Sequence, residues 1–158
     1  MDWLPLISTL LGAFIGVGST LVVDRVRWRR DQERQGRETR RTVYVEFLGA
    51  LHTARESFWL LSRGVIPPGK SLEDAAREVL HISQVWITGE RLLITAPQTV
   101  IDVVDIVTKE LRRLRDVVGA GHTNESPEFH QAESTYVDAL INLRATIRND
   151  LDIRPSTW

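Results

Sequence analysis

The sequence predicts an all-α protein with an N-terminal transmembrane helix, a charged helical stalk and an antiparallel four-helix bundle. Three observations predict this fold. An uncharged run opens the chain, an Arg-rich segment follows it, and the remaining sequence repeats apolar residues at intervals of three and four. This spacing places apolar side chains on one face of a helix. No alternating run is long enough to favour a sheet.

Residues 1–23 are predicted to form a membrane anchor. The 21 residues from Trp3 to Val23 carry no charge, and a helix of this length rises roughly 31 Å, close to the hydrocarbon thickness of about 30 Å. Trp3 and Trp28 are expected to anchor the helix at the two membrane interfaces. The alternatives are a buried core helix and a cleaved signal peptide, but a signal peptide carries positive charge before its apolar run, where this chain has Asp2.

Residues 24–42 hold eight Arg and four acidic residues and are predicted to form the stalk. Positive charge beside a membrane span stays on the cytoplasmic side. The N-terminus is therefore expected outside the plasma (inner) membrane and the rest of the chain in the cytoplasm. We expect anionic lipid headgroups to contact four of these residues: Arg25, Arg27, Arg29 and Arg30. A solvated charged helix is an equal alternative for the distal half of the stalk.

Small residues recur every four positions in the uncharged run, at Ser8, Gly12, Gly16 and Thr20. Such a ridge lets two membrane helices approach closely, so it is a candidate self-association face and makes the chain a candidate homo-oligomer. The alternative is that Gly is simply common in membrane helices.

Residues 43–153 are predicted to form the cytoplasmic bundle, and residues 154–158 a tail. Four amphipathic stripes define its helices. The first stripe is Tyr44, Phe47, Leu51, Ala54, Phe58 and Leu61. The second, with Ser71 as N-cap and Gly89 as its end, is Leu72, Ala75, Val79, Ile82 and Trp86. The third, with a 4-3 spacing typical of coiled coils, is Val100, Val104, Val107, Leu111, Leu114 and Val118.

The fourth stripe follows Ser126 and Pro127 and consists of Phe129, Ala132, Tyr136, Ala139, Leu140, Leu143 and Ile147. Thr95 and Gln98 resemble a capping box at the start of the third helix. Residues 91–94 are consistent with either an extended segment or another helical turn. The sequence also leaves open whether the stalk and the first bundle helix are one continuous helix.

Residues Gly64 to Ser71 match the P-loop pattern G-x-x-x-x-G-K-S. A P-loop needs consecutive backbone N–H groups around a phosphate and a preceding strand. Pro67 and Pro68 have no N–H, and an amphipathic helix precedes this segment. We therefore predict an inter-helix loop, and we keep a membrane-tethered nucleotide-binding protein as the alternative function.

The remaining polar residues suggest no catalytic or metal site. Glu78 and His81 form a single E-x-x-H, whereas a di-iron bundle needs two, and His81 lies roughly 160° from Val79 on the helix. The other three histidines, His52, His122 and His130, form no ligand set. Asp102 and Asp105 are expected to be solvated, and Trp59 and Trp86 to lie in the bundle core or at its rim. The chain has no Cys, so thiolate chemistry is excluded.

By architecture the chain resembles uncharacterised small single-pass membrane-anchored helical proteins of high-GC bacteria, with the span followed by Asp24 to Arg30 and by a helix opening at Tyr44 to Leu48. The resemblance implies no activity. The expected function is a non-enzymatic membrane protein, without cofactor or metal, that presents a cytoplasmic protein-interaction domain to an unknown cytoplasmic protein. A structural lipid-binding membrane-surface protein is a further alternative. The mildly acidic bundle gives no reason to expect nucleic-acid binding.

Overall fold

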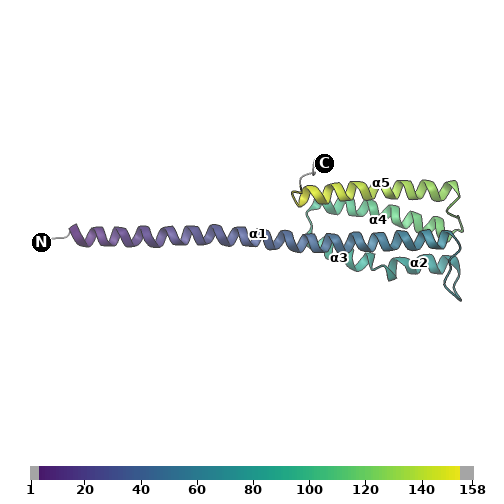
Figure 1. Ribbon diagram of the computed structural model, residues 1–158, viewed down its shortest axis with the longest axis horizontal. Helices are drawn as coiled ribbons and strands as arrows, with labels where there is room; N and C mark the ends of the chain where they lie inside the picture. The colour runs from purple at the N-terminus through teal and green to yellow at the C-terminus, as the bar shows by residue number, and fades with distance from the viewer. Residues whose placement is uncertain (1–3, 154–158) are drawn as a thin grey trace. The chain divides into compact units, whose positions relative to one another are not determined.

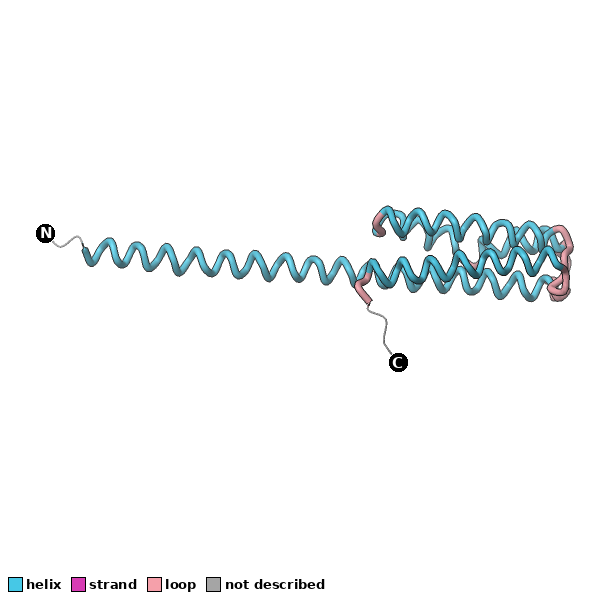
Figure 2. The backbone as a smooth tube through the Cα atoms, turned by 90° about the horizontal axis from the view of Figure 1, so that it is seen from above, coloured by secondary structure: helices cyan, strands magenta, loops and turns pink. Residues whose placement is uncertain are grey.

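The computed structural model describes the backbone of residues 4–153 and the side chains of Trp28, Gln32 and residues 34–153. This part of the chain is all helical and contains no strand. Its five helices, shown in Figures 1 and 2, are α1 (Leu4–Ser62), α2 (Leu72–Ile82), α3 (Val85–Thr95), α4 (Gln98–Gly119) and α5 (Pro127–Asp150).

The chain divides into two compact units, Met1–Glu38 and Thr39–Trp158. The first unit contains the N-terminal part of α1. The second contains the remainder of α1 and the other four helices. The bounds of α1 include both the predicted stalk and the predicted first bundle helix, which answers the question that the sequence left open.

Among the residues whose side chains are described, no helix is both long and apolar enough to cross a bilayer. The two longest helices that lie wholly among these residues, α4 and α5, are amphipathic and carry charged residues in nearly every turn. This finding contradicts the predicted single-pass membrane protein. The predictions of a plasma-membrane localisation and of a membrane-anchored function are therefore wrong.

Most of the residues predicted to act at the membrane lie outside the described side chains. These are the ridge residues Ser8, Gly12, Gly16 and Thr20, the anchor Trp3 and the lipid-contact residues Arg25, Arg27, Arg29 and Arg30. Trp28 is described and is exposed. The predicted tail, residues 154–158, also lies outside the described range.

One hydrophobic core holds the second unit together, and residues of all four predicted stripes contribute to it. Every predicted stripe residue of α1, α4 and α5 is buried. Each stripe fills the core because its 3–4 spacing keeps these side chains on one side of the helix. Ser126 caps α5 as predicted, its Oγ accepting a hydrogen bond from the Phe129 backbone N–H at 3.2 Å.

Helices α1 and α5 are joined by polar contacts at three levels. The Tyr44 hydroxyl donates to Asp150 Oδ2 at 2.7 Å, the Tyr136 hydroxyl donates to the Leu51 carbonyl at 3.2 Å, and Arg55 pairs with Glu133 at 2.6 Å. Burial raises the pKa of Tyr44 well above its usual range, and its hydrogen bond to the Asp150 carboxylate adds to the shift. Arg40 Nε lies 3.4 Å from the same carboxylate oxygen.

The predicted second helix is wrong in its length and in the last two residues of its stripe: Ala75 and Val79 are buried as predicted, but Ile82 and Trp86 are exposed. It ends at Ile82, and a separate helix, α3, runs from Val85 to Thr95, so that Gly89 lies inside a helix and residues 91–94 are helical. Ser71 does cap α2, its Oγ accepting from the Asp74 backbone N–H at 3.1 Å. The predicted capping box is absent, because Thr95 ends α3 and the Gln98 side chain donates to Asp102.

Candidate functional site: an exposed apolar face on α3

The break between α2 and α3 determines which side chains α3 buries. Gln84 has a φ of 60° and lies in the left-handed region, which few non-glycine residues adopt. The Gln84 carbonyl then accepts the Thr88 backbone N–H at 3.0 Å and starts a new helix. The left-handed residue changes the rotation of α3 relative to α2, so the apolar stripe of α2 does not continue onto α3.

The inner face of α3 consists of Val85, Thr88 and Leu92, all buried. The Thr88 hydroxyl is satisfied within the helix, because it donates to the Gln84 carbonyl at 2.9 Å. Gly89 lies against the Phe47 ring of α1, where an added Cβ would sit 3.5 Å from Phe47 Cε2. These residues attach α3 to the core.

The outer face of α3 carries two exposed isoleucines. Ile87 is 55% exposed and Ile94 is 84% exposed. Residues seven apart lie on nearly the same side of a helix, so these two isoleucines form one stripe. Glu90 and Arg91 lie between them, and we call this set of four residues the α3 face.

A groove of about 450 Å³ runs beside the α3 face, between α1 and the α2–α3 break. Arg91 Nη1 lies 3.1 Å from Glu46 Oε2 at its margin. Ile82, predicted to be buried, is 67% exposed here. Ser83 also lines the groove, and its Oγ is buried without a hydrogen-bond partner among the described residues. The groove therefore combines exposed apolar carbon with one unsatisfied hydroxyl.

Trp86 and Leu93 form the other flank of α3, beside a smaller pocket of about 220 Å³ between α3 and α4. The Arg112 guanidinium lies over the Trp86 ring, 4.5 Å from its centroid. Such a cation–π contact is favourable at exposed sites. Trp59 is held similarly by Arg63 at 4.7 Å. Both tryptophans lie partly exposed at the rim of the bundle, which agrees with one of the two positions expected for them.

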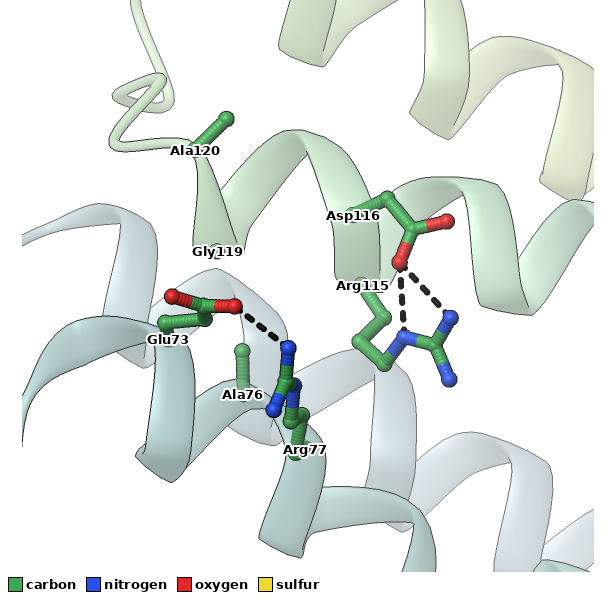
Figure 3. A pocket seen from close by; sticks show the side chains of 7 residues that line it. All are labelled: Glu73, Ala76, Arg77, Arg115, Asp116, Gly119 and Ala120. Carbon is green, nitrogen blue, oxygen red and sulfur yellow. Dashed lines mark hydrogen bonds and ion pairs between the residues drawn. The ribbon is translucent and has the colours of Figure 1, made fainter.

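Another pocket, of about 510 Å³, lies between α2 and α4 (Figure 3). Its four charged side chains are paired within their own helices: Arg77 with Glu73 at 2.5 Å, and Arg115 with Asp116 at 2.7 Å. Gly119 and Ala76 allow the two helices to approach, the Ala76 Cβ lying 3.8 Å from an added Gly119 Cβ. Two positive and two negative groups leave no net charge to hold an ion.

The P-loop-like segment forms the predicted loop between α1 and α2. Four of its six backbone N–H groups bond within the chain: Gly64 donates to Leu61, Val65 to Leu60, Ile66 to Gly64 and Lys70 to Pro67. The Lys70 ammonium pairs with Glu78. Because these donors bond to carbonyls of the chain itself, the loop does not present the array that a phosphate requires.

The other chemical candidates remain apart. His52 lies 3.9 Å from Glu56, His122 lies 3.4 Å from Glu128, and His81 and His130 are exposed. Among the described residues no group of three or more His, Cys, Asp or Glu could hold a metal ion. Asp102 and Asp105 are exposed on α4, as expected.

Sequence reasoning missed the α3 face because it placed Trp86 at the end of one helix and left residues 91–94 undecided. A signal was present. Apolar residues occur on every side of α3, at positions 85–87 and 92–94. A helix that is apolar all round needs more than one apolar neighbour.

Comparison of the chain with protein-family models, curated proteins and solved structures found no match.

Proposed function

We propose that this chain is a non-enzymatic protein-binding module, in which an antiparallel four-helix bundle presents the α3 face to another protein. In this bundle the two short helices α2 and α3 together take the place of the second helix. The order of contacts supports the antiparallel arrangement, since Tyr44, Leu51 and Arg55 of α1 meet Asp150, Tyr136 and Glu133 of α5 in reverse order.

The observation that carries the proposal is the exposure of Ile87 and Ile94 on one helix face. Single exposed apolar residues are common, but apolar residues grouped on one face mark an interaction surface. Ile82 and the groove extend the apolar area beyond the helix. Removing apolar surface from water contributes about 25 cal/mol per Å². A partner that covers this face removes its apolar surface from water, and this burial contributes favourable binding free energy.

The charged groups of the described pockets support a binding role over a catalytic one. Three guanidinium groups that line two of these pockets, those of Arg77, Arg115 and Arg91, are neutralised by adjacent carboxylates at 2.5, 2.7 and 3.1 Å. Catalytic sites usually contain titratable groups whose pKa values are strongly shifted. The two tyrosines with raised pKa values, Tyr44 and Tyr136, are buried in the core and line none of the three described pockets.

Photocrosslinking in cells that make the protein tests the proposal. A photoreactive phenylalanine analogue replaces Ile94, and the matched control replaces Ile141, a 57% exposed isoleucine on α5. We expect adducts with a protein, either another species or the chain itself, from position 94 and none from position 141. Equal yields at both positions, or no adduct at position 94, would show that the α3 face is not a binding surface.

A further inference from the structure

We propose that the α3 face binds the α3 face of a second copy of this chain, with the two α3 helices parallel and related by two-fold symmetry. This inference rests on the proposed function and identifies its partner. Ile87 and Ile94 form the centre of the contact. At about 100° per residue, Glu90 and Arg91 lie about 50° to either side of the isoleucine stripe. The face is therefore acidic on one flank and basic on the other.

The positions of these two charges select the direction of pairing. In a parallel two-fold pair, opposite flanks of the two helices meet, so Glu90 of each copy faces Arg91 of the other. In an antiparallel two-fold pair, identical flanks meet, and each charge faces its own counterpart. Opposite charges across an interface favour one arrangement and like charges disfavour the other. The α3 face is self-complementary only in the parallel arrangement.

Both charged groups are able to form the new contact. Glu90 is exposed and makes no ion pair among the described residues. Arg91 is paired with Glu46, but its side chain remains 61% exposed. A guanidinium has five N–H donors, so Arg91 can hold Glu46 of its own copy and Glu90 of the second copy together. Glu46 would then help to orient Arg91 toward the second copy.

The apolar stripe sets the register of the pair. In the parallel arrangement Ile87 faces Ile87 and Ile94 faces Ile94 across the two-fold axis, as at equivalent core positions of a parallel coiled coil. An antiparallel pair would instead place Ile87 opposite Ile94. Because α3 has only 11 residues, it is about 16 Å long and its contact area is small. The association is accordingly expected to be weak and reversible.

Disulfide crosslinking of the full chain tests the arrangement directly, because the sequence contains no Cys. The variants I87C and I94C each carry one thiol on the α3 face, and I141C is the matched control on α5. Pairing holds the two thiols at a high effective concentration, so with an added thiol oxidant we expect I87C and I94C to form disulfide-linked dimers at least about tenfold faster than I141C. A disulfide at these positions requires that the two α3 helices meet, so the test distinguishes pairing through α3 from association through another part of the chain.

The direction of the helices follows from mixing the variants. Crosslinks that form in a mixture of I87C and I94C, but in neither variant alone, would indicate antiparallel pairing and overturn the proposal. Crosslinking of I94C no faster than that of I141C would also overturn it. If position 94 nevertheless photocrosslinks to a different protein, the proposed function survives and only the identity of the partner is wrong. If position 94 gives neither product, both proposals are wrong.

A charge exchange tests the contribution of the two charged flanks, with the rate of I94C crosslinking as the readout. In the I94C background, E90R and R91E each place like charges on facing flanks, and both should lower the rate of dimer formation several-fold. The double variant E90R/R91E restores opposite charges and should recover it, as should an equimolar mixture of the two single variants. Unchanged rates in E90R and R91E would contradict the parallel pairing. Circular dichroism of each variant establishes that the helices are retained.

Discussion

The Tyr136 hydroxyl on α5 donates a hydrogen bond of 3.2 Å to the Leu51 carbonyl on α1, between two residues 85 positions apart. Both residues are fully buried. The carbonyl of a helical residue already accepts a backbone hydrogen bond, so the phenol occupies its second lone pair. Burial raises the pKa of Tyr136 to about 12, although the nearby Arg55 and Arg144 act in the opposite direction.

This shift predicts a loss of stability in alkali. The unfolded tyrosine titrates near pH 10. Between pH 10 and about 12 the unfolded chain loses a proton that folded Tyr136 retains, so the free energy of unfolding falls with rising pH by up to about 1.4 kcal/mol per pH unit. The Y136F variant should be less stable by about 1 kcal/mol at pH 8. Its deficit should shrink above pH 10 in urea titrations, and a constant deficit would contradict the assignment.

Leu111 on α4 is fully buried in the core. The L111A variant should lower the free energy of unfolding by about 2 to 5 kcal/mol, because it removes buried carbon and leaves a cavity. The control is I106A on the same helix, where the side chain is exposed and the change should be much smaller. Urea denaturation followed by circular dichroism measures both. Similar losses in the two variants would mean that α4 is rotated from its described position.

Ser83 and Ser62 are both buried, but only one hydroxyl is satisfied. Ser62 Oγ donates to the Trp59 carbonyl at 2.7 Å, whereas Ser83 Oγ has no partner among the described residues. The S62A variant should cost about 0.5 to 1.5 kcal/mol, while S83A should be neutral or stabilising, because an unsatisfied buried hydroxyl is unfavourable. Thermal unfolding compares them. A larger loss for S83A than for S62A would show that Ser83 is hydrogen-bonded.

The left-handed backbone of Gln84 predicts that glycine is preferred there. Gly adopts positive φ without steric cost, so Q84G should raise the free energy of unfolding by roughly 0.5 to 1 kcal/mol. The control Q131G lies on the exposed side of α5 and should lower it by about 1 kcal/mol, because Gly is unfavourable inside a helix. Destabilisation by both variants would indicate that Gln84 does not adopt this conformation in solution.

The stripes of α1, α4 and α5 could be predicted because each long helix repeats its apolar spacing over several turns, from Val100 to Val118 most regularly. Burial then follows from periodicity alone. The caps at Ser71 and Ser126 were predictable for a similar reason, since each requires only local residues. The capping box at Thr95 failed because α3 continues to that residue, where the Thr95 hydroxyl donates to the Arg91 carbonyl of its own helix.

The α2–α3 break and the α3 face could not be derived in the same way. The segment from His81 to Val85 contains no Gly or Pro to mark a break, and Gln84 is an uncommon residue in the left-handed region. The conformation lets Val85 and Leu92 reach the core while Gly89 lies against Phe47. These contacts depend on residues about 40 positions apart, which periodicity in a single segment does not reveal.

The contact between Arg40 and Asp150 has a consequence for how the chain could be reconnected. It places the point where the chain enters the Thr39–Trp158 unit beside the point where α5 ends, 3.4 Å apart at the ion pair. At the other end of this unit, the Asn124 N–H donates to the Ser62 carbonyl at 3.3 Å and brings the α1–α2 and α4–α5 turns together (Figure 1). Adjacent entry and exit points are what circular permutation requires. A short linker could thus join residue 153 to residue 39, with new termini placed in the exposed turn near Thr123. The permuted chain would form the same core from helices that follow one another in a different order.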